Sequence, residues 1–235
     1  MRNFEINWLN ILLGINLVIF VIMYFLSQNL RFESDFILIG ALSTDAVFNG
    51  YPWLLVTSNF IHFNLIHFLF NAFSFFNLGR IVNEFYPKTT ILIVYIFAGI
   101  TGSLLTVIVA MLTNTPMISI GASGSIFGLA GFLIAGTLKK QRYGYGLPYT
   151  FRDLAFPIGM SFAIGFIPGL GVNNWAHLGG FLGGVLLGFL IKNDLGEIKG
   201  KNYRVLEKTL YYVSLFILII SFFLLLFNVV NMIFL

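Results

Sequence analysis

Residues 121–128 read Gly-Ala-Ser-Gly-Ser-Ile-Phe-Gly and open an apolar run with a helical pattern. Ser123 stands in the first turn of that run, between small residues that leave room for a carbonyl group to approach its hydroxyl. The first turn of a helix also carries free N–H groups and the positive end of the helix dipole, which suit a developing oxyanion. Small residues in membrane helices also serve as packing surface, so the rest of the sequence must decide between the two interpretations.

The composition indicates a membrane protein. The chain has 235 residues, of which 58% are hydrophobic and 9% charged, and its mean hydropathy is +0.93. A soluble domain of this size cannot bury so much apolar surface, so we expect a polytopic membrane protein. The absence of cysteine excludes disulfides, thiolate zinc sites and a cysteine nucleophile. The net charge of +4 is modest, and we expect no cofactor, no bound metal and no nucleic-acid partner.

Seven apolar runs are long enough to be membrane spans. The first follows Arg2 and resembles a signal peptide, but its apolar run is longer than the hydrophobic region of a typical signal peptide, so we interpret it as an anchor helix. A polar stretch near 192–208 predicts two parts, a membrane core over 1–200 and a linker with an appended helix over 201–235. The predicted spans are 6–26, 57–79, 89–112, 122–138, 153–170, 175–191 and 209–235.

The loop charges predict the orientation of the chain. If the N-terminus is cytoplasmic, all 13 lysines and arginines except Arg31 lie in segments on the cytoplasmic side. Positive residues concentrate on the inner side of membrane proteins, so we expect the N-terminus inside and the C-terminus outside. The compact chain further suggests a bacterial plasma membrane.

Polar residues converge on one layer of the predicted bundle. The sequence has three histidines, His62, His67 and His177, all near the starts of predicted spans. The spans that carry them and Ser123 all run from the outside inward, and Asn71 lies one helical turn beyond His67. Ionisable groups are costly inside a membrane, so this layer in the outer half of the bilayer is a candidate functional site.

Helical phase separates the two histidines of the second span. His67 and Asn71 are four residues apart and share a helix face. His62 is five residues before His67, about 140° around the helix, so we expect the two rings to face different ways. This weakens a zinc interpretation, which needs ligands on one face, and leaves His62 a supporting role.

Glycine spacing predicts how the serine and a histidine meet. Span 6 repeats glycine every fourth residue over 180–188, and Gly124 and Gly128 have the same spacing in span 4. Faces of small residues let two helix backbones approach closely. If these two faces pack together, Ser123 comes close to His177.

Taken together, these motifs resemble the rhomboid family of intramembrane serine proteases over about residues 50–190. The resemblance implies an all-α, six-helix membrane core with a serine–histidine dyad, and the seventh helix matches the subgroup that has one extra C-terminal span. The motifs are Gly121-Ala122-Ser123-Gly124, His62-x4-His67-x3-Asn71 and Ala176-His177-x2-Gly180-x3-Gly184.

The resemblance also implies residue roles. Ser123 resembles the nucleophile and His177 the general base, while His67 and Asn71 resemble the side chains that hold the oxyanion together with the Ser123 N–H. His62, Gly121, Gly124 and Gly180 take supporting positions. Substrates would be transmembrane proteins in the lipid bilayer, cut after a small residue and admitted laterally near span 5.

One position departs from the family pattern. Trp53 fits the start of the tryptophan–arginine motif of the first loop, but Leu54 replaces the arginine. The change bears on the stability or membrane seating of that loop and leaves the dyad unaffected.

Four other classes of membrane protein are alternatives to a serine protease. An intramembrane metalloprotease needs H-E-x-x-H, which is absent. A transporter or channel predicts buried carboxylates, and the span interiors contain none. A catalytically silent rhomboid-like protein that binds membrane clients remains the main alternative. An aspartyl protease needs paired intramembrane aspartates, but those here, Asp35, Asp45, Asp153 and Asp194, lie in loops or at span ends.

Overall fold

The computed structural model describes the chain in several stretches. The predicted fifth span, 153–170, lies outside them except for Leu154, and so do Arg2, Arg31 and Asp35. The described residues are 6–26, 37–62, 64–143, 147–150, 152, 154, 171–194 and 201–234.

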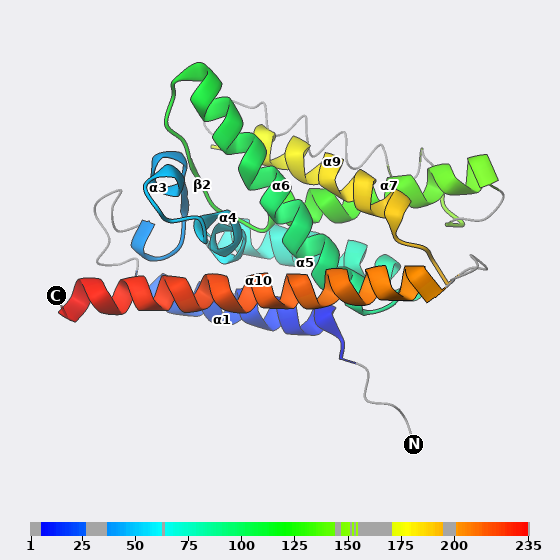
Figure 1. Cartoon of the computed structure of the whole chain (residues 1–235), viewed down its shortest axis with the longest axis horizontal. Helices are drawn as coiled ribbons and strands as arrows, with labels where there is room; N and C mark the ends of the chain where they lie inside the picture. The colour runs from blue at the N-terminus through cyan, green and yellow to red at the C-terminus, as the bar shows by residue number, and fades with distance from the viewer. Residues whose placement is uncertain are drawn as a thin grey trace.

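The described residues form a helical bundle with one short pair of strands (Figure 1). Most of the bundle consists of long helices, and short elements fill the segment between the first two of them. In chain order the elements are α1 (Trp8–Leu26), β1 (Leu42–Ser43), α3 (Thr44–Phe48), α4 (Leu54–Thr57), η2 (Ser58–Phe60), α5 (Leu65–Phe85), α6 (Thr89–Thr113), β2 (Ile118–Ser119), α7 (Ser123–Tyr143), α9 (Asn174–Leu190) and α10 (Lys201–Phe234).

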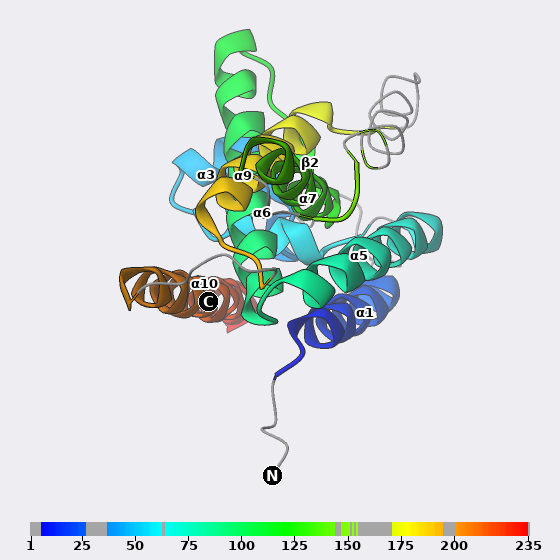
Figure 2. The ribbon, with the colours of Figure 1, turned by 90° about the vertical axis from the view of Figure 1, so that its right-hand side faces the viewer.

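Helix α6 lies at the centre, in contact with α1, α5, α7, α9 and α10 (Figure 2). Its first half is apolar on all sides, which is typical of a helix buried on all sides. Every side chain from Ile91 to Ile96 is at most 2% exposed. Because α6 touches both α7 and α9, it supports the two helices that carry Ser123 and His177.

Four helices in the described part of the chain are long and apolar enough to cross a membrane, namely α1, α5, α6 and α10. Helices α7 and α9 carry shorter apolar stretches, Ser123–Lys139 and Asn174–Leu190, and pack against each other and against α6. The chain is a multi-pass integral membrane protein, and the predicted all-α membrane bundle is confirmed.

The glycine faces of α7 and α9 meet, as their spacing predicts. A Cβ atom on Gly180 would collide with the carbonyl oxygen of Gly124, and one on Gly184 would collide with that of Gly128. The two backbones touch because these positions have no side chain. This contact brings the first turns of the two helices together.

Helix α5 begins later than predicted. The sequence predicts a span over 57–79, whereas the helix starts at Leu65, and Asn64 caps it by accepting a hydrogen bond from the His67 N–H. The preceding residues form α4 and η2, and Ile61 is extended. Hydropathy did not reveal this break, because it reports burial and not a change of chain direction.

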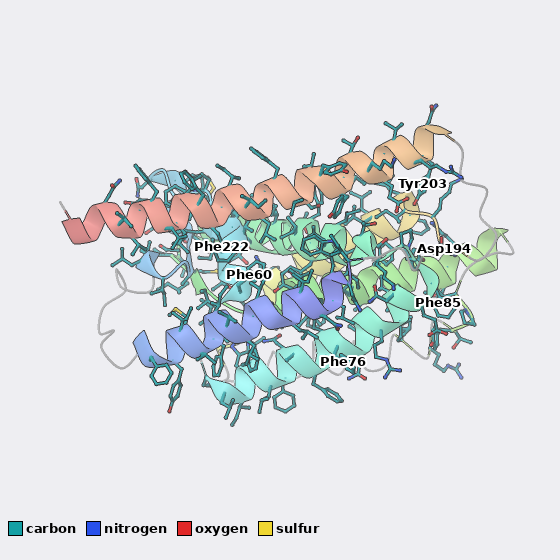
Figure 3. All side chains as sticks on the ribbon, turned by 90° about the horizontal axis from the view of Figure 1, so that it is seen from below. Phe60, Phe76, Phe85, Asp194, Tyr203 and Phe222 are labelled. Atoms are coloured by element: carbon teal, nitrogen blue, oxygen red, sulfur yellow. The ribbon has the colours of Figure 1, made fainter. Side chains whose placement is uncertain are left out.

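Helix α10 is longer than predicted and packs on the core. It begins at Lys201, so the polar stretch expected as a linker is partly helical, since Lys, Arg, Glu and Leu favour helices. The ring of Phe222 lies 5.2 Å from that of Phe60 (Figure 3), and the ring of Tyr211 lies 6.0 Å from that of Trp8. Aromatic side chains along α10 therefore contact η2 and α1, and the division of the chain at residue 200 stays a prediction.

The C-terminal end of α9 is tied to the same framework. The Asp194 N–H donates to the Phe85 carbonyl over 2.8 Å, and the Lys192 N–H donates to the Tyr203 hydroxyl over 2.9 Å (Figure 3). The buried Lys139 on α7 donates to the Ile191 carbonyl over 2.8 Å. These bonds hold α9 at the end opposite to His177.

A short strand pair joins the first loop to the segment before Ser123. Strands β1 and β2 are antiparallel, with Leu42 opposite Ser119 and Ser43 opposite Ile118. The Thr44 N–H donates to the Met117 carbonyl over 3.1 Å. In return, the Met117 N–H donates to the Thr44 hydroxyl over 3.0 Å. The turn at Gly121 follows directly.

Candidate active site

Ser123 and His177 meet at the first turns of their helices. Ser123 is the first residue of α7, and His177 is the fourth residue of α9. The Ser123 Oγ lies 2.9 Å from the His177 Nε2, and the histidine is 6% exposed. In the tautomer with its proton on Nδ1, the imidazole accepts the serine proton through this bond. The pair is therefore arranged as a nucleophile with its base.

Phe127 holds the imidazole from the other side. Its ring stacks on that of His177 with centroids 4.2 Å apart and planes 21° apart. Phe127 lies one helical turn after Ser123, so one helix presents the serine and also supports the histidine. Phe127 was not among the site residues predicted from the sequence, although its i+4 spacing from Ser123 places it on the same helix face.

Gly121 makes a turn that only glycine favours. Its φ is +118°, and its N–H donates to the Ser58 carbonyl over 2.9 Å. A Cβ atom here would lie 2.7 Å from the Nε2 of His67 and 3.7 Å from the Nδ2 of Asn71. The absence of a side chain thus lets the polar groups of α5 approach the residues just before Ser123.

His67 and Asn71 share one face of α5, as their spacing predicts. The Asn71 Nδ2 donates to the His67 carbonyl over 3.0 Å, and Asn71 is buried while His67 is half-buried. The structure brings both side chains beside the turn at Gly121. Their role toward an oxyanion stays a prediction.

His62 lies against His67, contrary to the helical-phase argument. Their rings are 5.2 Å apart in an edge-to-face arrangement, and the ring of Phe68 is 5.5 Å from His62. The expectation that the two histidines face different ways is wrong, because His62 precedes α5 and helical periodicity does not set its direction.

The His62 ring is buried. Neither of its ring nitrogens has a hydrogen-bond partner of ordinary geometry among the described residues. Its contacts with His67 and Phe68 are ring contacts, and its supporting role stays a prediction.

A buried polar network that sequence reasoning missed lies behind the serine. The Ser125 hydroxyl donates to the Tyr95 carbonyl over 2.7 Å, and the Tyr95 hydroxyl donates to the Asn59 carbonyl over 2.7 Å. Asn16 on α1 donates to the Tyr95 hydroxyl over 3.1 Å. Asparagine in an otherwise apolar span was the one available signal. The network joins α1, η2, α6 and α7 around the turn that precedes Ser123.

The position expected to hold an arginine lies in an apolar cluster. Leu54 is fully buried and packs with Leu42 and Val107, while the neighbouring Trp53 contacts the ring of Tyr51 at 5.2 Å. A leucine is suited to this dry environment, where an arginine would need a charged partner. The loop is held by packing at this position.

No group of three or more His, Cys, Asp or Glu residues that could hold a metal ion occurs in the part of the chain that the structure describes.

Comparison with known proteins identifies the family. Residues 49–194, more than half of the chain, match the Rhomboid domain. The chain is 34% identical over 166 residues to RHOMBOID-like protein 1 of Arabidopsis thaliana, which covers 69% of this chain and 41% of that protein. It is 29% identical over 194 residues to RHOMBOID-like protein 4 of the same plant, with 78% and 48% covered.

A bacterial relative is also similar. Rhomboid protease GluP of Bacillus subtilis is 30% identical over 147 residues, which covers 62% of this chain and 27% of that protein. The chain spans about half the length of the plant relatives that it matches. Because residues 49–194 match the Rhomboid domain and the structure is a helical membrane bundle, the chain belongs to the rhomboid family.

Proposed function

We propose that the chain is an intramembrane serine endopeptidase that cuts membrane proteins with a Ser123–His177 dyad. The observation that carries the proposal is the 2.9 Å contact between the serine hydroxyl and the imidazole. Membership of the rhomboid family supports it, as does the name of the Bacillus relative, which is called a protease.

The reaction follows from these groups. His177 takes the proton from the Ser123 Oγ as the oxygen attacks the peptide carbonyl carbon, which forms a tetrahedral intermediate. The same imidazole then gives the proton to the leaving amine, and water hydrolyses the acyl-enzyme by the reverse sequence of transfers. A base in this role is worth about 10²–10⁴ in rate.

The oxyanion is stabilised at the start of α7. The Ser123 N–H belongs to the first helical residue and has no partner within the helix. His67 and Asn71 present polar side chains beside the adjoining turn at Gly121. Each donor of this kind is worth roughly 10²–10³ in turnover.

The substrates are transmembrane proteins with a single span. In lipid a helix satisfies its backbone groups internally, so a segment has to unwind before its carbonyl is open to attack. Helix-breaking residues near the outer end of the substrate span make this easier. A small residue precedes the cut, and the substrate enters laterally near 153–170.

The topology and domain division complete the proposal. The charge distribution supports an inside N-terminus, an outside C-terminus and seven spans. A bacterial plasma membrane is the proposed location, and the similarity to a Bacillus subtilis protein supports it. Residues 1–200 form the catalytic core, and 201–235 contain α10 as the additional C-terminal span, which is docked on that core.

A fluorophosphonate probe tests the proposal. Purified wild-type protein is expected to react at Ser123, and Ser123→Ala is expected to lose the labelling without a change in melting temperature. Cleavage of a panel of single-span reporters, with mass spectrometry of the products, then locates the cut. Folded wild-type protein that neither labels nor cleaves would favour the silent, client-binding alternative.

A further inference from the structure

The helix that carries His177 is capped by Asn173, whose side-chain amide forms hydrogen bonds through both its oxygen and its nitrogen. The Asn173 Oδ1 accepts hydrogen bonds from the Trp175 and Ala176 N–H groups over 3.1 and 3.2 Å. Its main-chain carbonyl accepts from the His177 N–H over 3.3 Å. Asn173 therefore satisfies three donors of the first turn of α9, and the last of these belongs to His177.

The other end of the amide reaches α6. The Asn173 Nδ2 donates to the Thr106 Oγ over 2.9 Å, and the Thr106 hydroxyl donates in turn to the Gly102 carbonyl over 3.1 Å. Thr106 is fully buried. Because the Thr106 hydroxyl donates its proton within α6, its oxygen is available to accept a hydrogen bond from the Asn173 amide. The bond to Thr106 thereby sets which end of the amide faces the N–H groups of α9.

The same face of α6 touches the residue before His177. Gly102 lies one turn before Thr106, and a Cβ atom on Gly102 would lie 2.6 Å from the Ala176 carbonyl oxygen. On the opposite side, a Cβ atom on Gly124 of α7 would lie 3.3 Å from that oxygen. The first turn of α9 is thus held between two backbones, and the Thr106–Asn173 bond is the polar link across this contact.

We propose that Thr106 and Asn173 are positioning residues that hold the His177 imidazole in line with Ser123. This inference rests on the proposed protease function and assigns the pair no contact with substrate. The hydrogen bond fixes the start and rotation of α9 relative to α6, and the imidazole follows because it lies on the first turn. Reaction rates are sensitive to displacements of about 1 Å in such groups.

Variants of the two residues isolate the link. Thr106→Val removes the hydroxyl at nearly constant volume, and Thr106→Ser keeps it. Thr113→Val is the matched control, because the exposed Thr113 hydroxyl lies on the same helix and donates to the Val109 carbonyl four residues earlier over 2.8 Å, as that of Thr106 does to Gly102. Asn173→Ala removes both the cap and the link.

The expected result is a loss of turnover without a loss of substrate binding. Thr106→Val lowers kcat and the rate of fluorophosphonate labelling about three- to tenfold, with KM unchanged. Thr106→Ser and Thr113→Val stay within about twofold of the wild type. In an Asn173→Ala background, Thr106→Val has no further effect, because the bond is already absent.

A second measurement does not depend on catalysis. Hydrogen–deuterium exchange in peptides covering 174–178 is expected to become faster in Thr106→Val and to stay at the wild-type rate in Thr113→Val. Wild-type labelling rate and wild-type exchange in Thr106→Val would overturn the inference, as would multiplicative effects in the double variant. A wild-type protein that does not label would refute the protease proposal instead, and the exchange experiment would still decide whether the link orders α9.

Discussion

The ring of Phe127 lies 4.2 Å from the ring of His177 and nearly parallel to it, so the helix that bears Ser123 also restrains the His177 imidazole. Without this stacked ring, the imidazole would be free to rotate away from its 2.9 Å contact with the Ser123 hydroxyl. Phe127→Leu is therefore expected to lower kcat, by roughly two- to tenfold for a ring contact of this kind. Phe127→Tyr keeps the ring and should retain most activity. Steady-state cleavage of a single-span reporter measures both, and an unchanged kcat in Phe127→Leu would remove the restraint from the mechanism.

Removing the base should stop the reaction while the fold persists. His177→Ala is expected to lower cleavage by at least about 10²-fold, because it removes the group proposed to take the serine proton. The melting temperature should stay near that of the wild type, since the imidazole contributes to the site more than to the helix contacts. Cleavage near the wild-type rate would refute the dyad.

Asn71 is expected to act on the transition state. Asn71→Ala should reduce kcat by roughly 10²–10³ with little change in KM, as expected when an oxyanion donor is lost. Asn77→Ala on the same helix is the control, because its amide donates to the carbonyl of Phe73 four residues earlier, just as the Asn71 amide donates to that of His67. A rise in KM at constant kcat would instead make Asn71 a substrate-binding residue.

The contact between α7 and α9 should not tolerate an added methyl group. Gly180→Ala places its Cβ against the Gly124 carbonyl and is expected to destabilise the protein by about 1–3 kcal/mol. Gly180→Val should destabilise the protein more than Gly180→Ala, because its side chain is larger. Gly14→Ala in α1 provides the comparison, since nothing lies within 4 Å of its new Cβ and alanine favours helices. Thermal unfolding in detergent measures both, and equal melting temperatures for Gly180→Ala and the wild type would argue against backbone contact at this position.

The buried network behind the serine should contribute to stability. Tyr95→Phe leaves the Asn59 carbonyl without its bond and removes a partner of Asn16, so we expect a loss of about 1–3 kcal/mol. Tyr212→Phe on the exposed side of α10 should have little effect. Chemical unfolding followed by tryptophan fluorescence compares the two. A Tyr95→Phe protein as stable as the wild type would mean that the freed groups find other partners.

Local spacing predicted the parts of the site that depend on one helix or on two glycine faces. The shared face of His67 and Asn71 follows from helical periodicity, and the meeting of α7 with α9 follows from the four-residue glycine repeats. The break before α5 escaped detection because the residues on both sides of it are apolar. The direction predicted for the His62 ring was wrong because it assumed that His62 lies within that helix.

Contacts between distant segments were beyond the reach of pattern analysis. The bond between Thr106 and Asn173, and the one between Tyr95 and Asn16, join residues on different helices. Nothing in the periodicity of either helix specifies the partner of a buried hydroxyl. The docking of Phe222 on Phe60 is similar, because hydropathy treats lipid and protein as the same apolar surroundings.

The pairing of Leu42–Ser43 with Ile118–Ser119 makes the first loop and the serine turn one mechanical unit. Ser119 is two residues from Gly121, so a displacement of the loop reaches the turn before Ser123 through a few covalent bonds. Any molecule that binds to the first loop would therefore also shift the residues that orient the Ser123 hydroxyl.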